Sequence, residues 1–361
     1  MKPKILILGA TGKLGVKLVS FCVNKNININ SITCHTNYKK LLHLKNKSKI
    51  PNTFILSDLR QRNKFIKFLK SRYFNIIYFL DYGSLSLEYL ELIINKNKNS
   101  YIAIANKELL IAGGKLLTNQ IKINKNILIP LDSEHFSLFG KNFSNDNIYK
   151  IYITASGGPF YFKKNTDLKK VAFENVINHP KWKMGINNSI DSSNFVNKYL
   201  EMFELSIIYN IDIKKIDFFI SRESYVHSVI LYKDGNISFN CFDNNMILPL
   251  VKPLQYFFDF DFINISNKYL DNKNLSISKF NDNRFKINLY KNKIRSFDHK
   301  QIIKFLILNN ITHEKYIKSQ VSYNNILNYI FSKIYINDGN YDLNSFKNII
   351  NYIKMIKEKY A

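Results

Sequence analysis

Two acidic residues and a histidine follow one apolar run in the first half of the sequence. Asp132, Glu134 and His135 come directly after Ile127–Leu131, which has the composition of a buried strand. Residues i and i+2 of an extended segment point to the same side, so we expect the two carboxylates to converge. Adjacent carboxylates repel unless a cation lies between them, and oxygen ligands suit a hard ion such as Mg²⁺ or Mn²⁺. The motif predicts part of a metal site, although an acidic turn exposed to solvent would have the same sequence pattern.

A second group of polar residues shares one face of a predicted helix. Asn197 and Glu201 are four residues apart, and Lys198 lies three before Glu201. We expect Ser192 or Ser193 to cap the N-terminus of this helix. An amide, an ammonium and hydroxyl groups suit a phosphate, and Glu201 is available as a third metal ligand. The alternative for the lysine and the glutamate is an exposed ion pair.

A glycine-rich turn near the start of the sequence predicts a dinucleotide site. Gly9, Gly12 and Gly15 lie between the strand-like run Ile5–Leu8 and a helix-like segment. Glycines let backbone amides approach a pyrophosphate, and a helix N-terminus favours its negative charge. A plain strand–helix turn is the alternative. Aspartate-semialdehyde dehydrogenases open similarly, but they need an activated cysteine, and none of the three cysteines here is placed like one.

The end of the second predicted strand bears on which cofactor is bound. No acidic residue follows Thr33 at a position that could bind a ribose 2′-hydroxyl, whereas Lys39 and Lys40 could pair with a 2′-phosphate. This pattern favours NADPH over NADH, unless the two lysines simply begin the next helix.

A third turn, over residues 154–160, combines exposed amides with a hydroxyl group. Gly157 and Gly158 have no side chains to cover their backbone amides, and Ser156 supplies the hydroxyl. An ordinary Gly-Pro turn is the alternative. His179, considered alone, is more often a structural residue than a ligand.

The helices and strands that must position these residues follow one pattern in the first 125 residues and another pattern after them. Strand-like runs alternate with helical periodicity over the first 125 residues, which implies a parallel, doubly wound sheet. The pattern then becomes mixed, with a hairpin signal at Lys233–Gly235 and a helix over about 193–209. We predict an α/β chain with an NADPH-binding Rossmann-like domain at 1–125, a central α+β catalytic domain at 126–250, a connecting segment at 251–280 and a C-terminal helical domain at 281–361.

The net charge of +26 suggests nucleic-acid binding at first sight. However, Lys, Asn, Ile, Phe and Tyr are enriched together, and all have A/T-rich codons, so mutational bias explains the lysines. They are also spread along the whole chain. No apolar run reaches 18 residues, and no signal-peptide pattern precedes the first strand. We therefore expect a cytoplasmic protein with neither a nucleic-acid nor a membrane partner.

Taken in order, these segments resemble the 1-deoxy-D-xylulose 5-phosphate reductoisomerase family. The resemblance covers roughly residues 1–250 and fades beyond them. It rests on GATGKLG at 9–15, ANKELL at 105–110, PLDSEH at 130–135, TASGGPF at 154–160, HPKWKMG at 179–185, DSSNFVNKYLE at 191–201 and SYVHSVILYKDG at 224–235.

The resemblance implies an activity, cofactors and an assembly. The family converts 1-deoxy-D-xylulose 5-phosphate to 2-C-methyl-D-erythritol 4-phosphate in the non-mevalonate pathway to isoprenoid precursors. The reaction joins a metal-assisted rearrangement of the carbon skeleton to hydride transfer from NADPH. The implied cofactors are NADPH and a divalent metal (Mg²⁺, Mn²⁺ or Co²⁺), and the implied assembly is a homodimer. The alternative is a catalytically impaired relative that only binds ligands.

The resemblance also implies roles for individual residues. The matching metal ligands are Asp132, Glu134 and Glu201, which with Lys107 and His179 form the catalytic set. The matching substrate-binding residues are Lys107, Ser133, Glu134, Ser156, His179, Ser192, Asn197, Lys198 and Glu201. The matching cofactor-binding residues are Thr11, Gly12, Lys13, Leu14, Asn37, Asn106, Glu108 and Gly185. Trp182 and Met184 match a mobile flap, and His227 matches a histidine near the active site.

Some positions depart from the family pattern. His35 and Thr36 replace the usual residues near the 2′-phosphate, and Ile186 and Asn187 replace basic residues after the flap. Tyr199 replaces a small glycine, so we expect it to crowd the adjacent wall of the site. None of these changes removes a metal or phosphate group, so we expect activity, whether full or reduced.

Overall fold

The computed structural model describes residues 2–161, 171–177, 185–259, 275–280 and 285–361. The chain forms two compact units, and each unit takes in two separate stretches of sequence. The first unit consists of residues 1–139 and 245–269, and the second of residues 140–244 and 270–361. The four-part division at residues 125, 250 and 280 stays a prediction.

The first unit is built on a six-stranded parallel sheet, which confirms the predicted α/β class. The strands are β1 (Ile5–Leu8), β2 (Ser31–Cys34), β3 (Asn52–Ile55), β4 (Ile76–Phe79), β5 (Tyr101–Ile104) and β6 (Ile127–Pro130). Their order in the sheet is β3-β2-β1-β4-β5-β6. The order reverses between β1 and β4, and open α/β sheets bind ligands beyond the carboxyl ends of the strands at such a point.

Helices connect these strands. They are α1 (Lys13–Asn24), α2 (Tyr38–Ser48), α3 (Leu59–Ser71), α4 (Leu87–Lys96), α5 (Lys107–Ile123) and the short α6 (Ser133–Phe136), with a 3₁₀ turn, η1 (Ser84–Ser86), before α4. All residues of β1 and β4 are fully buried, as expected for strands in the middle of a parallel sheet covered on both faces. The first unit therefore has a core centred on these two strands.

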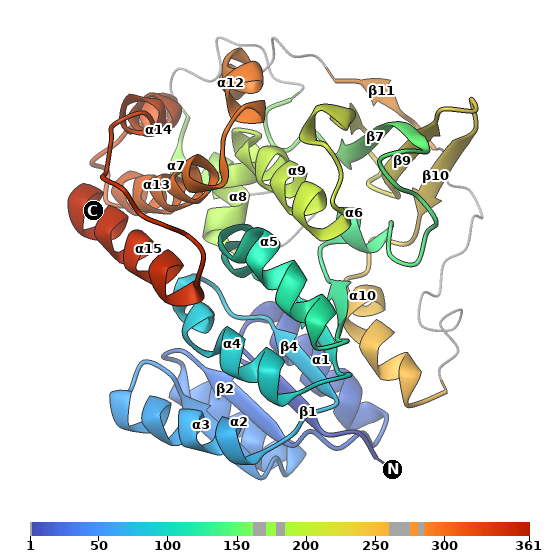
Figure 1. The fold of residues 1–361 in the computed structure, drawn as a ribbon, viewed down its shortest axis with the longest axis vertical. Helices are drawn as coiled ribbons and strands as arrows, with labels where there is room; N and C mark the ends of the chain where they lie inside the picture. The colour runs from blue at the N-terminus through green and yellow to red at the C-terminus, as the bar shows by residue number, and fades with distance from the viewer. Residues whose placement is uncertain (1, 162–170, 178–184, 260–274, 281–284) are drawn as a thin grey trace. The chain divides into compact units, whose positions relative to one another are not determined.

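The chain returns to the first unit after the last strand of the second one. The returning elements are α10 (Ile247–Val251) and η4 (Lys252–Tyr256). Helix α10 packs against α1 (Figure 1). The hydroxyl of Tyr78 in β4 donates to the carbonyl of Leu250 at 2.9 Å, and the rings of Tyr101 and Tyr256 stack with centroids 4.3 Å apart. These contacts make the returning segment part of the core of the first unit.

The second unit contains a five-stranded mixed sheet in the order β10-β9-β7-β8-β11. Its strands are β7 (Ile148–Ala155), β8 (Ile216–Ile220), β9 (Val226–Tyr232), β10 (Ile237–Cys241) and β11 (Ser278–Lys279). Strand β7 is parallel to β8 and antiparallel to β9. The predicted hairpin joins β9 to β10, with Gly235 at φ +88°, a backbone conformation that glycine adopts without strain.

The other regular elements among the described residues of the second unit are helices. They are α7 (Phe173–Ile177), α8 (Ile186–Ser193), α9 (Val196–Tyr209), α12 (Lys291–Arg295), α13 (His299–Ile317), α14 (Ile326–Lys333) and α15 (Phe346–Tyr360), with 3₁₀ turns η3 (Ile213–Lys215), η6 (Lys286–Tyr290) and η7 (Tyr323–Asn325). Helix α13 packs against both α14 and α15, which agrees with the helical character predicted for the last part of the chain. Within the described residues, no helix is both long enough and apolar enough to cross a membrane.

The helix predicted over about residues 193–209 is confirmed as α9, but the predicted cap at Ser192 or Ser193 is wrong. Helix α8 ends at Ser193 and α9 begins at Val196, with Phe195 between them at φ +70°. Ser192 and Ser193 therefore lie in the last turn of α8 and do not cap α9. Instead, the side-chain oxygen of Asn194 accepts from the amide of Val196 at 3.0 Å, which stabilises the reversal of the chain.

The close packing of α1 against the preceding turn gives a test of the first unit. A Cβ atom at Gly15 would lie 2.5 Å from the Cα atom of Ala10, and the crowded atoms are backbone. We expect Gly15→Ala to lower the free energy of unfolding by about 1–3 kcal/mol in denaturant titration.

The matched control is Gly12→Ala in the same turn. Gly12 has φ −70°, and the atom nearest to a Cβ there would be the carbonyl oxygen of Gly9, at 3.4 Å. This change should alter the free energy of unfolding by less than about 0.5 kcal/mol. Equal destabilisation by the two substitutions would contradict the packing described for Gly15.

Candidate active site

The turn after β1 has the geometry of a dinucleotide-binding loop. Gly9 has φ +80°, and a Cβ atom there would lie 2.6 Å from the Cα atom of Asp81, so only glycine fits against the end of β4. Gly12 is the N-cap residue of α1 and provides no capping side chain, and its own amide donates to the carbonyl of Gly9 at 3.1 Å. Thr11, Lys13 and Leu14 complete the turn and the first residues of α1. Backbone amides at such a helix N-terminus can hold a pyrophosphate.

Asp81 lies beside this turn and was missed in the sequence. It is the first polar residue after the apolar run of β4, and that position was the available signal. The Ser86 hydroxyl donates to Oδ2 of Asp81. Burial raises the pKa of the Asp81 carboxyl to about 6, although hydrogen bonds from Ser86 and Asn106 act in the opposite direction. Its Oδ1 atom is buried and has no hydrogen-bond partner among the residues that the structure describes.

The residues after β5 line the next part of the same sheet edge. Asn106 caps α5 by accepting from the amide of Leu109 at 2.9 Å, and its side chain donates to the carbonyl of Gly83 at 3.0 Å. Glu108 is buried in the first turn of α5. Lys107 lies between them and extends toward the end of β6, where its ammonium is 2.8 Å from Oδ2 of Asp132.

The two carboxylates after β6 do converge, but not for the predicted reason. Strand β6 ends at Pro130 and α6 begins at Ser133, so Asp132 and Glu134 do not alternate along an extended segment. Asp132 is the N-cap of α6 and accepts from the amide of Glu134 at 3.3 Å. This local reversal places carboxylate oxygens of the two residues within 4.8 Å of each other. The Ser133 hydroxyl donates to Glu134, which orients the second carboxylate.

His135 supports this cluster from the protein interior. Its side chain is fully buried, and its Nδ1 atom lies 3.8 Å from Oδ1 of Asp132. Together with Lys107, it places two nitrogen groups around one carboxylate. The first unit thus presents two neighbouring carboxylates, a serine hydroxyl and a lysine at one sheet edge, a donor set that suits a hard divalent cation and an oxygen-rich ligand.

The predicted helix face in the second unit is confirmed. Asn197, Lys198 and Glu201 are in contact on α9, and the Lys198 ammonium lies 2.6 Å from Oε2 of Glu201. The Asn197 amide donates to the other carboxylate oxygen. The Glu201 side chain is only 2% exposed and that of Lys198 only 9% exposed, so the alternative of a solvated surface ion pair is wrong. Burial of such a pair has to be compensated by its mutual attraction and its other hydrogen bonds.

The glycine turn after β7 packs on the end of α8. Gly157 has φ +95° and Gly158 has φ +61°, and a Cβ at Gly158 would lie 2.7 Å from the carbonyl oxygen of Ser192. This close approach brings the segment that carries Ser156 next to the one that carries Ser192. The second unit therefore carries two hydroxyl groups on neighbouring segments, and hydroxyl groups can donate hydrogen bonds to a phosphate.

Asn37 and the lysines after it lie at the start of α2. The Asn37 side chain caps that helix by accepting from the amide of Lys40 at 3.1 Å. Lys39 and Lys40 are exposed in its first turn. They do begin the helix, and their exposure also leaves them accessible to a 2′-phosphate, so both interpretations of this pair stay open.

The remaining predicted residues lie in varied surroundings. His227 is buried in β9, stacks on Phe242 with ring centroids 3.9 Å apart, and has its Nε2 atom 3.2 Å from the carbonyl of that residue. Tyr199 is fully buried, and its hydroxyl donates to Asn288 at 2.7 Å. Gly185 is exposed and precedes α8. The predictions for His179, Trp182 and Met184 fall outside the described residues.

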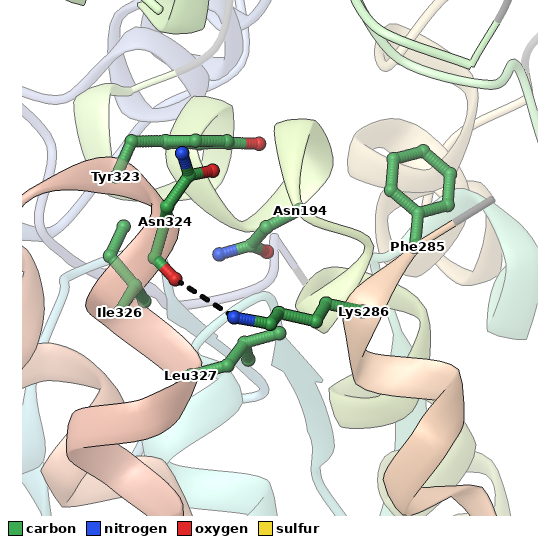
Figure 2. A pocket seen from close by; sticks show the side chains of 7 residues that line it. All are labelled: Asn194, Phe285, Lys286, Tyr323, Asn324, Ile326 and Leu327. Atoms are coloured by element: carbon green, nitrogen blue, oxygen red, sulfur yellow. Dashed lines mark hydrogen bonds between the residues drawn. The ribbon is translucent and has the colours of Figure 1, made fainter. Parts of the chain in front are cut away.

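Figure 2 shows a separate hollow in the second unit, beside the break between α8 and α9. Asn194 from this break points into it, and the Lys286 ammonium donates to the carbonyl of Asn324 at 3.5 Å across it. It encloses about 410 Å³ of empty space that includes open solvent. None of the predicted site residues lines it, so we do not assign it to the reaction. Its lining residues are Asn194, Phe285, Lys286, Tyr323, Asn324, Ile326 and Leu327.

Comparison with known proteins finds similarity to one enzyme family. Residues 128–209 match the model of the 1-deoxy-D-xylulose 5-phosphate reductoisomerase C-terminal domain. The reductoisomerase of Pelagibacter ubique is 32% identical over 335 residues, which cover 86% of this chain and 81% of that protein. The enzyme of Clostridium kluyveri is 31% identical over 310 residues, covering 78% of this chain and 79% of its own.

Solved structures show the same fold. The reductoisomerase from Zymomonas mobilis in complex with NADPH superposes with a TM-score of 0.81 at 20% identity, covering 100% of this chain and 98% of that one. A reductoisomerase structure with NADPH, fosmidomycin and magnesium also gives a TM-score of 0.81 at 20% identity, with coverages of 99% and 97%.

The buried ion pair on α9 gives a test of the second unit. Lys198→Met removes the ammonium and leaves the Glu201 carboxylate buried without its cation. We expect the free energy of unfolding to fall by about 3 kcal/mol or more in denaturant titration at neutral pH. Lys214→Met, at an exposed position of the same unit, is the control and should change the value by less than about 0.5 kcal/mol. Similar effects of the two changes would argue against a buried pair.

The raised pKa of Asp81 gives a test that depends on pH. Folding raises this pKa from its ordinary value of 3.8 to about 6, so the folded state binds the proton more tightly and loses stability as pH rises between these values. Asp81→Asn cannot ionise, so its stability relative to the wild type should increase from pH 4 to pH 7, by at most about 3 kcal/mol. Parallel unfolding curves across this range would contradict the shift, and Glu91→Gln on the exposed face of α4 serves as the control.

Proposed function

The chain belongs to the 1-deoxy-D-xylulose 5-phosphate reductoisomerase family, and we propose that the residues described above carry out that family's reaction. The enzyme converts 1-deoxy-D-xylulose 5-phosphate to 2-C-methyl-D-erythritol 4-phosphate with NADPH and a divalent metal such as Mg²⁺. The observation that carries this conclusion is the 32% identity to a named reductoisomerase over 86% of the chain. A relative that only binds ligands is not favoured, because the carboxylates and the phosphate-binding groups are all present.

Three carboxylates form the proposed metal site: Asp132, Glu134 and Glu201. Each of the two units provides its own observation in support of this metal site. The first two carboxylates already lie close together beside Lys107, and the third is buried beside Lys198. In each unit an ammonium compensates the negative charge. A bound cation would take over this compensation, which would leave both lysines available for oxygen atoms of the substrate.

The substrate phosphate is proposed to bind at Ser156, Ser192, Asn197 and Lys198. Hydroxyl, amide and ammonium groups all donate hydrogen bonds, and the lysine adds the positive charge that a phosphate dianion needs. The close packing of Gly158 on Ser192 fixes the distance between the two serine-bearing segments. This cluster would hold the phosphate-bearing part of the substrate while its carbon chain breaks and rejoins, so the two parts stay in position to recombine.

The cofactors supply the chemistry that side chains cannot. When bound, the metal acts as a Lewis acid toward the substrate's ketone and hydroxyl oxygens, and NADPH supplies the hydride. Lys107, held by Asp132, is placed to donate to a substrate oxygen. Asn106 shapes the loop after β4 through its bond to Gly83, beside the turn that would hold the pyrophosphate. The other predicted cofactor residues, among them Asn37, Glu108 and Gly185, are proposed on the family resemblance alone.

A homodimer and a cytoplasmic location are proposed as well. The homodimer rests on the family resemblance, and the location rests on the sequence pattern.

The carboxylate of Glu201 gives the direct test of the metal site. Glu201→Gln keeps the shape of the side chain but removes the charge that a divalent cation needs. We expect turnover to fall by about two orders of magnitude or more, followed as the loss of NADPH absorbance with 1-deoxy-D-xylulose 5-phosphate and Mg²⁺. The fold should survive, as judged by circular dichroism.

Two measurements accompany this test. Glu358→Gln, which changes an exposed carboxylate on α15, is the matched control and should keep wild-type turnover. Calorimetric titration with Mn²⁺ should show weaker metal binding by Glu201→Gln. Wild-type turnover of this variant at limiting metal would refute the assignment of Glu201 as a ligand.

A further inference from the structure

We propose that Asp81 contacts the bound dinucleotide, with Oδ1 accepting a hydrogen bond from a hydroxyl of the ribose on the nicotinamide side. The proposal rests on the use of NADPH and adds a residue for which the family motifs give no role. Its basis is the place of Asp81 in the sheet, the contacts of its carboxylate and the direction in which a dinucleotide crosses the sheet edge.

The position of Asp81 follows from the register between β1 and β4. Leu8 lies opposite Phe79 in this parallel pair, and the amide of Leu80 donates to the carbonyl of Leu8 at 2.9 Å. Leu80 is therefore level with Gly9, and Asp81 is the next residue along the chain. The close approach at Gly9 places the Asp81 backbone directly against the turn that binds the pyrophosphate.

The strand order decides which half of the cofactor Asp81 meets. In a doubly wound sheet the adenosine ribose lies beyond the end of the second strand, and β2 is on one side of β1. Strand β4 is on the other side. A dinucleotide with its pyrophosphate at the β1 turn must therefore extend its nicotinamide half past the end of β4. The donors of that half nearest the pyrophosphate are the ribose hydroxyls.

The carboxylate of Asp81 is prepared for such a donor. One oxygen accepts from Ser86, which fixes the orientation of the side chain. The other oxygen is buried and has no partner within the described part of the chain. A buried acceptor without a hydrogen bond is unfavourable, and no such cost remains if a ligand hydroxyl donates to it. Burial also raises the pKa of the Asp81 carboxyl, because removal from water disfavours the charged form more than the hydrogen bonds from Ser86 and Asn106 favour it.

A pair of probes separates this contact from other effects. NADPH carries the nicotinamide ribose, whereas adenosine 2′,5′-bisphosphate carries only the adenosine half. We would measure the dissociation constant of each by calorimetric titration with the wild type, Asp81→Leu and Asp81→Asn. We expect Asp81→Leu to weaken NADPH binding about tenfold or more and to leave binding of the bisphosphate within about twofold. Asp81→Asn keeps an acceptor oxygen and should lie between the wild type and Asp81→Leu.

Other outcomes would overturn the proposal. Equal weakening of both probes would mean that Asp81 only maintains the shape of the turn. Unchanged or tighter NADPH binding would mean that the carboxylate makes no contact or merely repels the phosphates. Glu91→Gln removes one negative charge from the surface of the same unit and should leave both dissociation constants unchanged.

The same titrations separate the contact of Asp81 with NADPH from the proposed function of the protein. Binding of NADPH by the wild type tests the function without reference to Asp81, so a negative result for the variants alone would overturn only the contact. A wild-type protein that bound no NADPH would overturn both. Circular dichroism and thermal unfolding of each variant establish that the affinities refer to folded protein.

Discussion

The parallel register of the first sheet is the constraint on which the first half of the site depends. Parallel pairing places the carboxyl ends of all six strands at one edge, so residues far apart in sequence become neighbours there. The turn at Gly9, the carboxylate of Asp81, the cap at Asn106 and the cap at Asp132 each come within two residues of a strand end. A shift of one strand by a single residue would move its polar residue away from this edge and exchange the side chains that pack on the two faces of the sheet.

Buried charge pairs are the second common feature of the site. Lys107 with Asp132 and Lys198 with Glu201 are mostly shielded from water, so each partner depends on the other for its stability. Such pairs contribute little to net stability compared with apolar packing, but they hold the side chains in a fixed position. A carboxylate already held by a lysine is ordered before a metal arrives, and a lysine already held by a carboxylate is ordered before a phosphate arrives. In the proposed site, the pairs thus order the side chains before ligands of either sign bind.

Much of this arrangement could be predicted from the sequence, and the omissions have physical causes. The buried strands and the shared face of Asn197, Lys198 and Glu201 follow from periodicity, which depends on the local chain alone. Helix α3 was not located, and α2 was considered only as an alternative for Lys39 and Lys40. Lysines and other polar residues replace most of the apolar stripe of both helices, and only two residues of each are buried. The helix break at Phe195 and the role of Asp81 depend on tertiary contacts, and no local pattern distinguishes them from a continuous helix or a polar loop.

The return of the chain to the first unit has a consequence for the order of synthesis. Tyr78 in the central strand β4 bonds to Leu250, and Tyr101 stacks on Tyr256, so the dinucleotide-binding unit is complete only when residues up to about 256 have left the ribosome. Domains generally fold as units during translation. Here the strands β7 to β10 of the second unit are synthesised before α10, so the face of α1 that packs against α10 stays uncovered until then. No single cut in the chain can separate the two units into intact pieces.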